Sequence, residues 1–575
     1  MSDPAATREP ATLRDLATRW HAADPDPQTR DAIASMLERG DEAELGACFG
    51  GRLGFGTAGI RGTMGPGPNR MNLALVRQVT WGLARYLLKT CDAGALVVVG
   101  RDGRRNSDVF TDEVARLLAH AGLQVRRYDG VVPTPVLAHA VLALGAQAGV
   151  MITASHNPPA DNGYKVYWGN GAQIVPPHDG GIAAEIAALG GPWAVPTQLD
   201  PGERIQPVPA AVDEAYERKV LALRVHAETG IKAVYTAMHG VGWEWMDRIA
   251  RAAGHTPLVP VTEQVEPDAA FPTVSFPNPE EPGALDLAMQ TAARSGAELI
   301  VAHDPDADRL AVCVPEGDGW RQLTGNEVGI LLADDLLAHG TPHDNRLVAT
   351  TIVSTSLLGK VAALHGAHLT ETLTGFKWIA NAAISWDGPF ILGFEEALGY
   401  SAGPVVRDKD GVSAAMLFLD LASWCKARGV TLLEHLADLY RRTGYASSQQ
   451  ISLKLPGAAG KARIAEIMDG LRSAPPASLA GARVHTIRDV QTGLATDTAT
   501  GDTRPLGLPA SNVLAFDLEG GGRVLARPSG TEPKVKFYFE VQAALGEGEP
   551  LSAAEARADA AMTALKAAFR AHAGA

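Results

Sequence analysis

Cysteine is scarce in this sequence of 575 residues, and the few cysteines lie far apart. No two of them form a Cys-x-x-Cys pair, so neither a disulfide framework nor a cysteine zinc cluster is indicated. We therefore expect the protein to reside in a reducing compartment. The four cysteines are Cys48, Cys91, Cys313 and Cys425.

Long apolar runs and an excess of positive charge are also missing. Residues 1–30 alternate in charge without the apolar core of a signal peptide, and no stretch has the apolar length of a membrane span. The formal net charge of −14 argues against a nucleic-acid partner, because a phosphate backbone is bound by a basic surface. We expect a cytoplasmic protein without a membrane or nucleic-acid partner, whose anion sites are local clusters of Arg, Lys and backbone N–H groups.

The remaining composition is that of a globular enzyme, with 46% hydrophobic and 20% charged residues. At roughly 150 residues a domain, the length predicts about three to four domains. Helical patterns alternate with strands such as 96–99 and 124–128, which predicts mainly parallel sheets covered on both faces. We expect an N-terminal helical extension over 1–49, followed by parts at 50–205, 206–322, 323–444 and 445–575.

A serine at the tip of a strand is the first candidate reacting group. The small apolar run 148–152 predicts a buried strand, and the prolines that follow in Thr-Ala-Ser-His-Asn-Pro-Pro (153–159) end it in a loop. Ser155 is thus presented on a rigid scaffold beside His156, although these residue types also favour ordinary turns. Lys165 follows closely, either near this loop or as a solvated side chain.

Residues 54–62 contain a literal Gly-x-Gly-x-x-Gly pattern. The dinucleotide fingerprint requires a preceding buried strand, and 46–53 is a poor one. A protein-kinase loop would have Val where Arg61 stands. The alternative is a flexible segment in which backbone N–H groups, Thr57 and Arg61 approach an anion closely.

Three aspartates at alternate positions fill a short loop between two apolar strands, 298–302 and 310–314. Three negative charges this close repel one another unless a cation lies among them. Carboxylate oxygens are hard ligands, so Asp304, Asp306 and Asp308 predict a Mg²⁺ site.

Two familiar types of acidic loop match this segment less well. An EF-hand needs Gly and Glu where this chain has Arg309 and Pro315. A haloacid-dehalogenase-type phosphatase has Thr or Val where Asp308 stands. A solvated acidic turn is the remaining alternative, although both flanking segments have the apolar composition of buried strands.

Two later loops carry groups suited to a phosphorylated sugar. Glu395 and Glu396 follow the strand 390–393, as hydroxyl acceptors for a sugar or as a solvated turn. The stretch Arg-Pro-Ser-Gly-Thr (527–531) offers a guanidinium, two hydroxyls and a glycine, which suits a small phosphate. It lacks the Walker pattern, so a P-loop is not supported, and a plain hairpin loop is the alternative.

These motifs together, Thr-Ala-Ser-His-Asn-Pro, Asp-Pro-Asp-Ala-Asp-Arg and Arg-Pro-Ser-Gly-Thr-Glu-Pro, in this order, resemble the α-D-phosphohexomutase superfamily. The resemblance is greatest to its phosphoglucomutase/phosphopentomutase branch and covers roughly residues 50–545. It implies an α/β fold: three related α/β domains with mixed sheets plus a smaller α+β C-terminal domain around a central cleft.

The resemblance also implies roles for the candidate residues. Ser155 would be the phosphoserine, and Asp304, Asp306 and Asp308 would bind Mg²⁺ together with an oxygen of its phosphate. Lys165 would be the general base, with Arg61 and His156 near the transferring group. The residues implied in substrate binding are Thr57, Arg309, Thr374, Gly375, Glu395, Lys409, Arg527, Ser529, Gly530 and Thr531, with Lys409 and the 527–531 loop holding the phosphate that is not transferred.

The predicted reaction is the interconversion of glucose 1-phosphate and glucose 6-phosphate through a sugar 1,6-bisphosphate, which also serves as activator. Phosphopentomutase or phosphomannomutase activity is the nearest alternative, because Ala397 replaces a serine hydroxyl that many relatives carry in the sugar loop. More distant alternatives are a Mg²⁺-dependent sugar phosphatase with Asp304 as nucleophile and a non-catalytic sugar-phosphate binder. We expect a small-molecule sugar phosphate as the partner, and a monomer or weak dimer.

Overall fold

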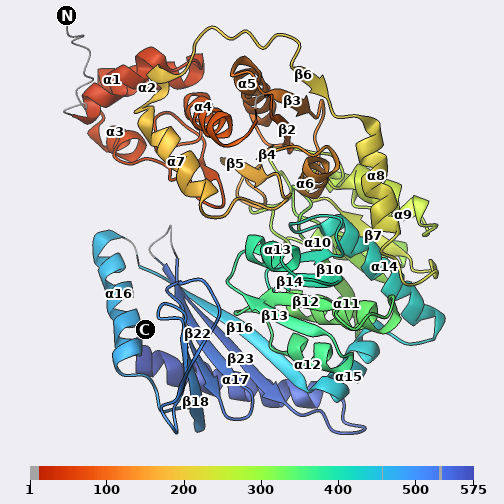
Figure 1. Ribbon diagram of the computed structural model, residues 1–575. Coiled ribbons are helices and arrows are strands. Elements are labelled where there is room, and N and C mark those ends of the chain that lie inside the picture. Colours follow the sequence, from red (N-terminus) through yellow and green to blue (C-terminus); the bar gives the residue numbers. More distant parts are fainter. Residues whose placement is uncertain (1–11, 93, 456, 530–533, 575) are drawn as a thin grey trace, which may run out of the picture. The chain divides into compact units, whose positions relative to one another are not determined.

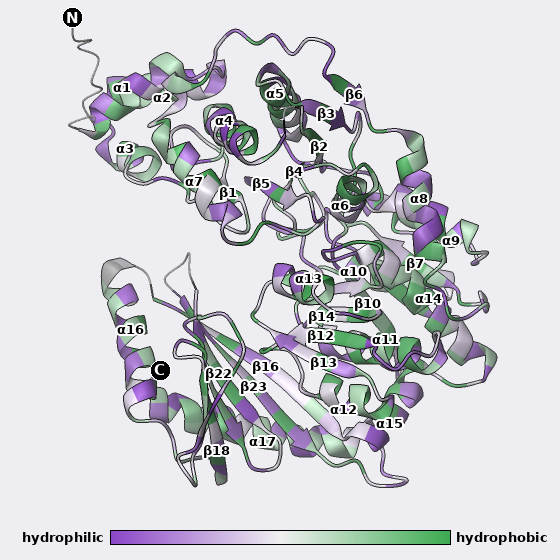
Figure 2. Ribbon diagram, in the orientation of Figure 1, coloured by the Kyte–Doolittle hydropathy of each residue, from purple (hydrophilic) through white to green (hydrophobic). Residues whose placement is uncertain are grey.

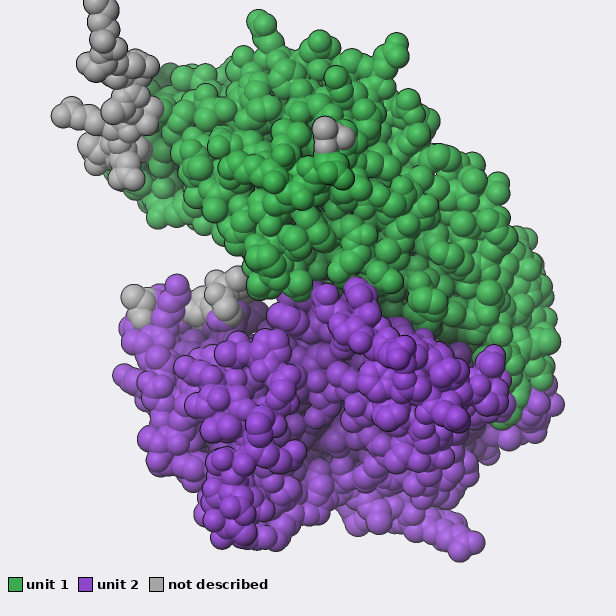
Figure 3. All heavy atoms as spheres, in the orientation of Figure 1, with its two compact units in different colours: residues 1–323, 397–424 green, residues 324–396, 425–575 purple. Residues whose placement is uncertain are grey.

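The computed structural model describes residues 12–92, 94–455, 457–529 and 534–574 (Figure 1). The chain forms two compact units, one of residues 1–323 and 397–424 and the other of residues 324–396 and 425–575 (Figure 3). Across the described ranges, no helix combines the length and the apolar character needed to cross a membrane.

Three short helices open the first unit: α1 (Leu13–Ala23), α2 (Pro27–Arg39) and α3 (Glu42–Phe49). All three lie in the segment for which the sequence predicts helices, and α3 covers only the first half of residues 46–53, which make a poor strand. Its N-cap Asp41 accepts a hydrogen bond from the Glu44 backbone. Trp20 and Phe49 pack edge to face in a small core that also contains Ala74 of the next helix.

The first sheet has the strand order β1-β5-β4-β2-β3-β6. The strand β5 runs antiparallel to both of its neighbours, whereas β4, β2, β3 and β6 are parallel, so the sheet is mixed. The strands are β1 (Ile60–Thr63), β2 (Leu96–Arg101), β3 (Gln124–Arg127), β4 (Ala148–Ile152), β5 (Asp161–Trp168) and β6 (Ile205–Pro207). The helices and the 3₁₀ turn of this region are α4 (Leu73–Thr90), α5 (Ser107–His120), α6 (Thr134–Ala143), α7 (His178–Ala188) and η1 (Pro192–Ala194).

The second sheet, order β11-β10-β9-β7-β8, is also mixed, since β10 runs antiparallel to β9. All of β7 and the first four residues of β10 are buried. Figure 2 colours these strands by hydropathy, with hydrophobic residues in green. The strands are β7 (Ala233–Thr236), β8 (Val259–Pro260), β9 (Leu299–Ala302), β10 (Ala311–Glu316) and β11 (Gly319–Gln322). The helical elements are α8 (Ala210–Leu221), α9 (Trp243–Ala252), η2 (Thr262–Gln264), α10 (Asp286–Ser295) and α14 (Gly411–Ala427), and β15 (Gly399–Ala402) leads to α14.

One local design occurs in both sheets of the first unit. A buried parallel strand enters a short loop and returns as an antiparallel neighbour, β4 to β5 in one sheet and β9 to β10 in the other. Each loop contains a non-glycine residue in the left-handed region, Ser155 at φ 51° and Ala307 at φ 55°. Such backbone is disfavoured for residues with a Cβ and persists where the surrounding structure holds it. Each of the two sheets therefore carries one loop whose unusual backbone conformation is held by the surrounding structure.

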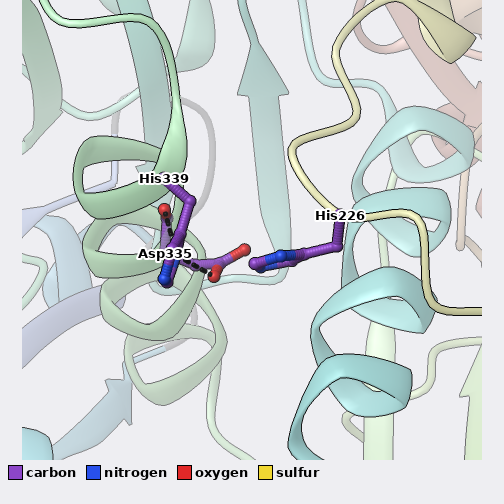
Figure 4. Close-up of side chains that lie close together, drawn as sticks. All are labelled: His226, Asp335 and His339. Atoms are coloured by element: carbon purple, nitrogen blue, oxygen red, sulfur yellow. Dashed lines mark hydrogen bonds and ion pairs between the residues drawn. The ribbon is translucent and has the colours of Figure 1, made fainter. Parts of the chain in front are cut away.

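In the second unit the strands β13, β12 and β14 lie side by side and parallel. They are β12 (Leu347–Thr351), β13 (His368–Thr372) and β14 (Phe390–Glu395), with helices α11 (Gly325–His339), α12 (Leu357–Leu364), α13 (Phe376–Ile384) and α15 (Leu432–Thr443). The helix α11 begins with a capping box between Thr324 and Glu327. In its last turn the His339 ring nitrogen Nδ1 lies 3.0 Å from Asp335 Oδ1 (Figure 4).

The second unit also contains an antiparallel sheet of order β16-β23-β22-β21-β18-β19-β20. Its strands are β16 (Tyr445–Lys454), β17 (Ser478–Leu479), β18 (Ala482–Asp489), β19 (Leu494–Asp497), β20 (Thr503–Pro505), β21 (Leu514–Leu518), β22 (Arg523–Pro528) and β23 (Lys534–Ala543). Two helices accompany it, α16 (Gly457–Ser473) and α17 (Leu551–Ala573). Phe537 and Phe539 of β23 pack against Phe569 of α17.

In β23 the apolar residues Val535, Phe537, Phe539 and Val541 share one face, and Tyr538 and Glu540 on the opposite face are buried as well. Tyr538 packs in a cluster with Ile352 and Val353 of the neighbouring loop. Glu540 is only 2% exposed and accepts a 3.0 Å hydrogen bond from the Ser356 backbone. Sequence alternation marks two faces, but it does not show that a polar face is covered by another part of the chain.

Candidate active site

Ser155 lies where β4 ends, and its hydroxyl points at the acidic loop of the second sheet. Ser155 Oγ donates a 2.9 Å hydrogen bond to Asp304 Oδ2 and lies 3.1 Å from His156 Nδ1. The Ser155 backbone N–H donates to Thr153 Oγ1 at 2.8 Å, which helps to fix the left-handed turn. The serine predicted from the sequence and the aspartate loop, 149 residues further on, are thus direct neighbours.

The three aspartates form a compact buried cluster. Asp304, Asp306 and Asp308 are all 0% exposed, and one carboxylate oxygen of each lies within 4.8 Å of the others. Asp306 Oδ1 and Asp308 Oδ1 are buried and have no hydrogen-bond donor among the described residues. Two orphaned carboxylate oxygens beside a third carboxylate fit a hard divalent cation, which could replace the missing donors.

The pKa values of the three aspartates are shifted in different directions. Burial, together with the charges of Asp306 and Asp308, raises the pKa of Asp304 well above its ordinary value. For Asp306 burial acts in the same direction, but the charge of Lys165 and hydrogen bonds, including that from Thr134, outweigh it and lower the pKa. For Asp308 the charges of Lys165, Lys409 and Arg309 outweigh burial and lower the pKa. Asp304 is therefore the carboxyl group that depends most on a bound cation to ionise.

Cationic side chains surround the cluster in the first unit. Lys165 Nζ lies 2.7 Å from Asp306 Oδ2 and 3.0 Å from Asp308 Oδ2, and Lys409 Nζ lies 3.3 Å from Asp308 Oδ2. The Arg309 backbone N–H donates to Asp304 Oδ1 at 3.1 Å. Burial disfavours the Lys165 ammonium, but the two aspartates outweigh it, so the pKa of Lys165 is raised.

Arg61 and His156 belong to the same electrostatic environment. Burial lowers the pKa of Arg61, and the nearby Arg309 lowers it further. Burial lowers the pKa of His156 well below its ordinary value, and Arg309 and Arg61 act in the same direction. His156 is thus a neutral imidazole that can exchange a hydrogen bond with the serine.

The glycine-rich segment forms a tight turn before β1. Gly56 and Gly59 bridge each other across Thr57, and Gly59 adopts φ 74° with its Cα facing the Tyr164 carbonyl. A Cβ at Gly59 would lie 1.9 Å from that oxygen, so only glycine fits. The segment is preceded by the helix α3 and not by a strand, which excludes the dinucleotide fingerprint.

Thr134 is a site residue that the sequence reasoning missed. Its hydroxyl donates to Asp306 Oδ2 at 2.7 Å and its backbone N–H to the Asp306 carbonyl at 2.9 Å. Thr134 begins α6, so the positive end of that helix faces the aspartate cluster. Its signal in the sequence is the Val-Pro-Thr-Pro stretch at 132–135, in which proline marks the start of a helix.

The predicted sugar-binding residues gather in the second unit. Glu395 Oε1 accepts a 2.8 Å hydrogen bond from the Gly375 backbone, next to Thr374. The following residue, Glu396, accepts a 2.8 Å bond from Ser354 Oγ and returns one from its backbone at 3.1 Å. These bonds fix the two glutamates in a defined loop rather than in a solvated turn.

The predicted phosphate-binding residues are only partly within the described residues. Arg527 lies near the end of β22, and the Ser529 backbone donates to the Lys534 carbonyl at 2.8 Å. Gly530 and Thr531 lie outside the described residues. Lys409, which we expected to act with this loop, lies in the first unit beside Asp308.

Family comparisons agree with this arrangement. Models described as phosphoglucomutase/phosphomannomutase alpha/beta/alpha domains I, II and III match residues 52–190, 212–317 and 324–443, and the model of the C-terminal domain matches residues 488–550. The chain belongs to the α-D-phosphohexomutase superfamily. The expected fold class, three α/β domains with mixed sheets and a distinct C-terminal domain, is confirmed.

Individual relatives of this superfamily member cover nearly its whole length. A Schizosaccharomyces pombe protein named "Probable phosphoribomutase" is 39% identical over 92% of this chain and 93% of its own length. A Haemophilus influenzae protein named "Probable phosphomannomutase" is 43% identical over 82% of this chain and 93% of its own. A crystal structure of a Burkholderia thailandensis family protein shares the fold, with a TM-score of 0.67 at 23% identity over 90% of this chain and 96% of that one. The chain is therefore a phosphomutase, an intramolecular phosphotransferase that acts as an isomerase.

Proposed function

We propose that this phosphomutase interconverts glucose 1-phosphate and glucose 6-phosphate by way of a phosphoserine at Ser155. The observation that carries the proposal is the 2.9 Å hydrogen bond from Ser155 Oγ to Asp304, at the edge of three buried carboxylates. In the first half-reaction the sugar hydroxyl attacks the phosphorus, a new C–O–P linkage forms, and the bond from phosphorus to Ser155 Oγ breaks. The second half-reaction returns the other phosphate of the resulting glucose 1,6-bisphosphate to Ser155.

Mg²⁺ is the ion that the residue set favours, because its donors are three carboxylates and no imidazole or thiolate. Asp304, Asp306 and Asp308 would hold it together with an oxygen of the phosphate on Ser155. The bound ion would supply charge neutralisation at the equatorial oxygens of the transferring group. Arg61 and Arg309 would add positive charge there, since phosphoryl transfer depends mainly on positioning and electrostatics.

We assign proton transfer with the sugar hydroxyl to Lys165. Its Nζ lies beside Asp306 and Asp308, in the aspartate cluster that Ser155 contacts through Asp304. Paired as it is here, Lys165 is an ammonium and can donate a proton. It becomes a base when its contact with the two carboxylates weakens, because their charge is what raises its pKa.

The remaining predicted residues would recognise the substrate. Glu395, supported by the Gly375 backbone and beside Thr374, would grip ring hydroxyls. The phosphate that is not transferred would be held by the 527–531 loop, for which Arg527 supplies the guanidinium and Ser529, Gly530 and Thr531 the remaining donors. Thr57 and Lys409 would contact phosphate from the first unit.

A sugar 1,6-bisphosphate would be the activator as well as the intermediate. An enzyme that has lost its serine phosphate to water can regain it only from a donor of this kind. Incubation of dephosphorylated enzyme with glucose 1,6-bisphosphate should therefore transfer one phosphate to Ser155, measured by intact mass and peptide mapping. Phosphate on Asp304 with none on Ser155 would instead support the Mg²⁺-dependent phosphatase.

Phosphopentomutase activity is the second candidate, with phosphomannomutase activity beside it. Ala397 in the sugar loop has no hydroxyl, which leaves a ring hydroxyl of a hexose with one partner fewer. The relative named a phosphoribomutase points to pentose phosphates, and the one named a phosphomannomutase to mannose phosphate. Measuring kcat/KM for glucose 1-phosphate, mannose 1-phosphate and ribose 1-phosphate side by side decides among them, and a highest value for glucose supports the first proposal.

We also propose a cellular location, an oligomeric state and a domain organisation, from the composition and the family resemblance. We infer a cytoplasmic monomer or weak dimer, organised as a helical extension of residues 1–49 and four functional parts. Sedimentation at micromolar concentration tests the oligomeric state, and limited proteolysis tests the boundaries near residues 205, 322 and 444.

A further inference from the structure

Arg104 makes an unusually dense set of contacts with the loop that carries the reacting serine. Its side chain is buried, at 4% exposure, and its Nη2 donates to the Ser155 carbonyl at 2.6 Å and to the Asn157 carbonyl at 2.7 Å. Its Nη1 donates to the Pro158 carbonyl at 3.0 Å and to the Asp161 carbonyl at 3.2 Å. One guanidinium therefore binds four backbone carbonyls between the end of β4 and the start of β5.

The Arg104 side chain is itself held in place by Asp102 and by the ring of Phe271. Its Nε lies 3.2 Å from Asp102 Oδ2, and Asp102 Oδ1 accepts 2.9 Å bonds from the Arg104 backbone and from Ser107 Oγ. The guanidinium carbon lies 5.1 Å from the centre of the Phe271 ring. Asp102 is fully buried, so the ion pair is a fixed part of the first unit.

The serine loop needs such a support because its backbone is not relaxed. Ser155 adopts φ 51°, a left-handed conformation that is disfavoured for a residue with a Cβ and is kept only where neighbouring contacts enforce it. The loop also contains two consecutive prolines, Pro158 and Pro159, which have no backbone donor to offer. A planar guanidinium with five donors can bind several carbonyls at once, whereas a lysine ammonium has three donors on a flexible stem.

We infer that Arg104 is a positioning residue for phosphoryl transfer, which acts through the Ser155 peptide to aim the serine hydroxyl at Asp304. The inference rests on the proposed phosphoserine function of Ser155. Arg104 reaches carbonyl oxygens and not the reacting atoms, so it orients the nucleophile without taking part in the chemistry. Loss of its fork geometry displaces Ser155 Oγ but leaves the sugar and phosphate contacts of the second unit unchanged.

The test compares Arg104→Lys with a matched control, Arg346→Lys. Arg346 is also buried, at 9% exposure, and also binds two backbone carbonyls, those of Leu337 and His365, each at 2.7 Å. Full-length variants are compared by thermal unfolding, by kcat and KM, and by the rate at which glucose 1,6-bisphosphate phosphorylates Ser155. For Arg104→Lys we expect kcat and the phosphorylation rate to fall together by about a hundredfold with KM nearly unchanged, since an ångström of misplacement has an effect of this size.

Three outcomes are distinguishable. Arg104→Lys that keeps kcat within about threefold of the wild type, or loses no more than Arg346→Lys, overturns the inference. A wild-type enzyme that never carries phosphate on Ser155 overturns the proposed function itself. If Arg104→Lys does not fold, Asp102→Asn decides by the same criteria, because it removes the charge that orients the guanidinium and should lower kcat by about tenfold.

Discussion

Lys165 Nζ lies 2.7 Å from Asp306 Oδ2, although the two residues are 141 positions apart in the chain. Lys165 belongs to β5 and Asp306 to the loop after β9, so the contact joins the two mixed sheets of the first unit. The lysine thereby pairs with two of the three proposed metal ligands, Asp306 and Asp308. Under the proposed mechanism, the charge of the aspartate cluster would control the protonation of the group that exchanges a proton with the sugar hydroxyl.

Substitution of Ser155 by alanine should abolish turnover while binding persists. The variant lacks the hydroxyl that we propose carries the phosphate, so we expect a loss of at least about 10⁴-fold in kcat. Binding of glucose 6-phosphate, measured by calorimetry, should change by less than about threefold, because the residues proposed to bind the sugar, such as Glu395, are untouched. Substantial residual mutase activity would contradict the assignment of Ser155.

Substitution of Thr134 by valine should weaken metal binding. The variant keeps the shape of the side chain but removes the hydroxyl that orients Asp306, and loss of an outer partner of this kind costs about tenfold to a hundredfold in metal affinity. The measurement is the Mg²⁺ concentration that half-activates enzyme previously stripped with EDTA. Thr80→Val is the control, since that buried hydroxyl bonds to the Val76 carbonyl and to Tyr164 within the core.

Replacement of Lys165 by methionine should lower kcat by about 10²–10⁴-fold, the range of a lost general acid or base. Methionine fills a similar volume, but it cannot carry a proton or pair with Asp308. KM should change far less than kcat. A variant with nearly wild-type kcat at saturating Mg²⁺ would assign the proton transfer to another group.

Substitution of Arg527 by alanine should weaken binding of both monophosphates. Its guanidinium would hold whichever phosphate is not being transferred, so glucose 1-phosphate and glucose 6-phosphate should lose affinity alike. Hydrogen bonds to charged groups contribute about 1.5–3 kcal/mol, which corresponds to about tenfold to a hundredfold in the dissociation constant. Loss of affinity for only one of the two substrates would contradict this role.

Stability should depend on acid pH through Asp334. Burial raises the pKa of this carboxyl group, but Arg442 and His365 outweigh it and lower the pKa. Arg442 Nη2 lies 2.6 Å from Asp334 Oδ2, and His365 Nε2 lies 2.7 Å from Asp334 Oδ1. A carboxyl group with a lowered pKa in the folded state stabilises the protein above its ordinary pKa, and that contribution is lost as the pH falls below about 4. Urea unfolding at pH 7 and pH 3.5 should show a smaller decrease for Asp334→Asn than for the wild type, whereas Asp318→Asn, in an exposed turn, should behave like the wild type.

The local sequence was sufficient to predict the structure of a segment whose conformation depends mainly on its own residues. The apolar run 148–152 is the strand β4 with the predicted ends, because a buried strand needs apolar residues and proline ends its pairing. The alternating aspartates at 304–308 were recognisable as a cation site for a similar reason, since all three carboxylates lie in one short loop.

Contacts between residues far apart in the chain could be identified only from the tertiary structure. The sequence offered Lys165 as a side chain near the serine loop or in solvent, and the family resemblance assigned Lys409 to the phosphate that is not transferred. In the fold, strand register and the docking of residues 407–409 bring both to Asp308. The residues around Arg104 do not indicate its contacts, and only the folded chain shows that it binds the serine loop. The sequence by itself therefore determined which chemical groups this protein presents and in which loops, because those follow from local composition and spacing. Which of them touch was decided by packing, because a contact between residues more than a hundred positions apart depends on how entire sheets are assembled.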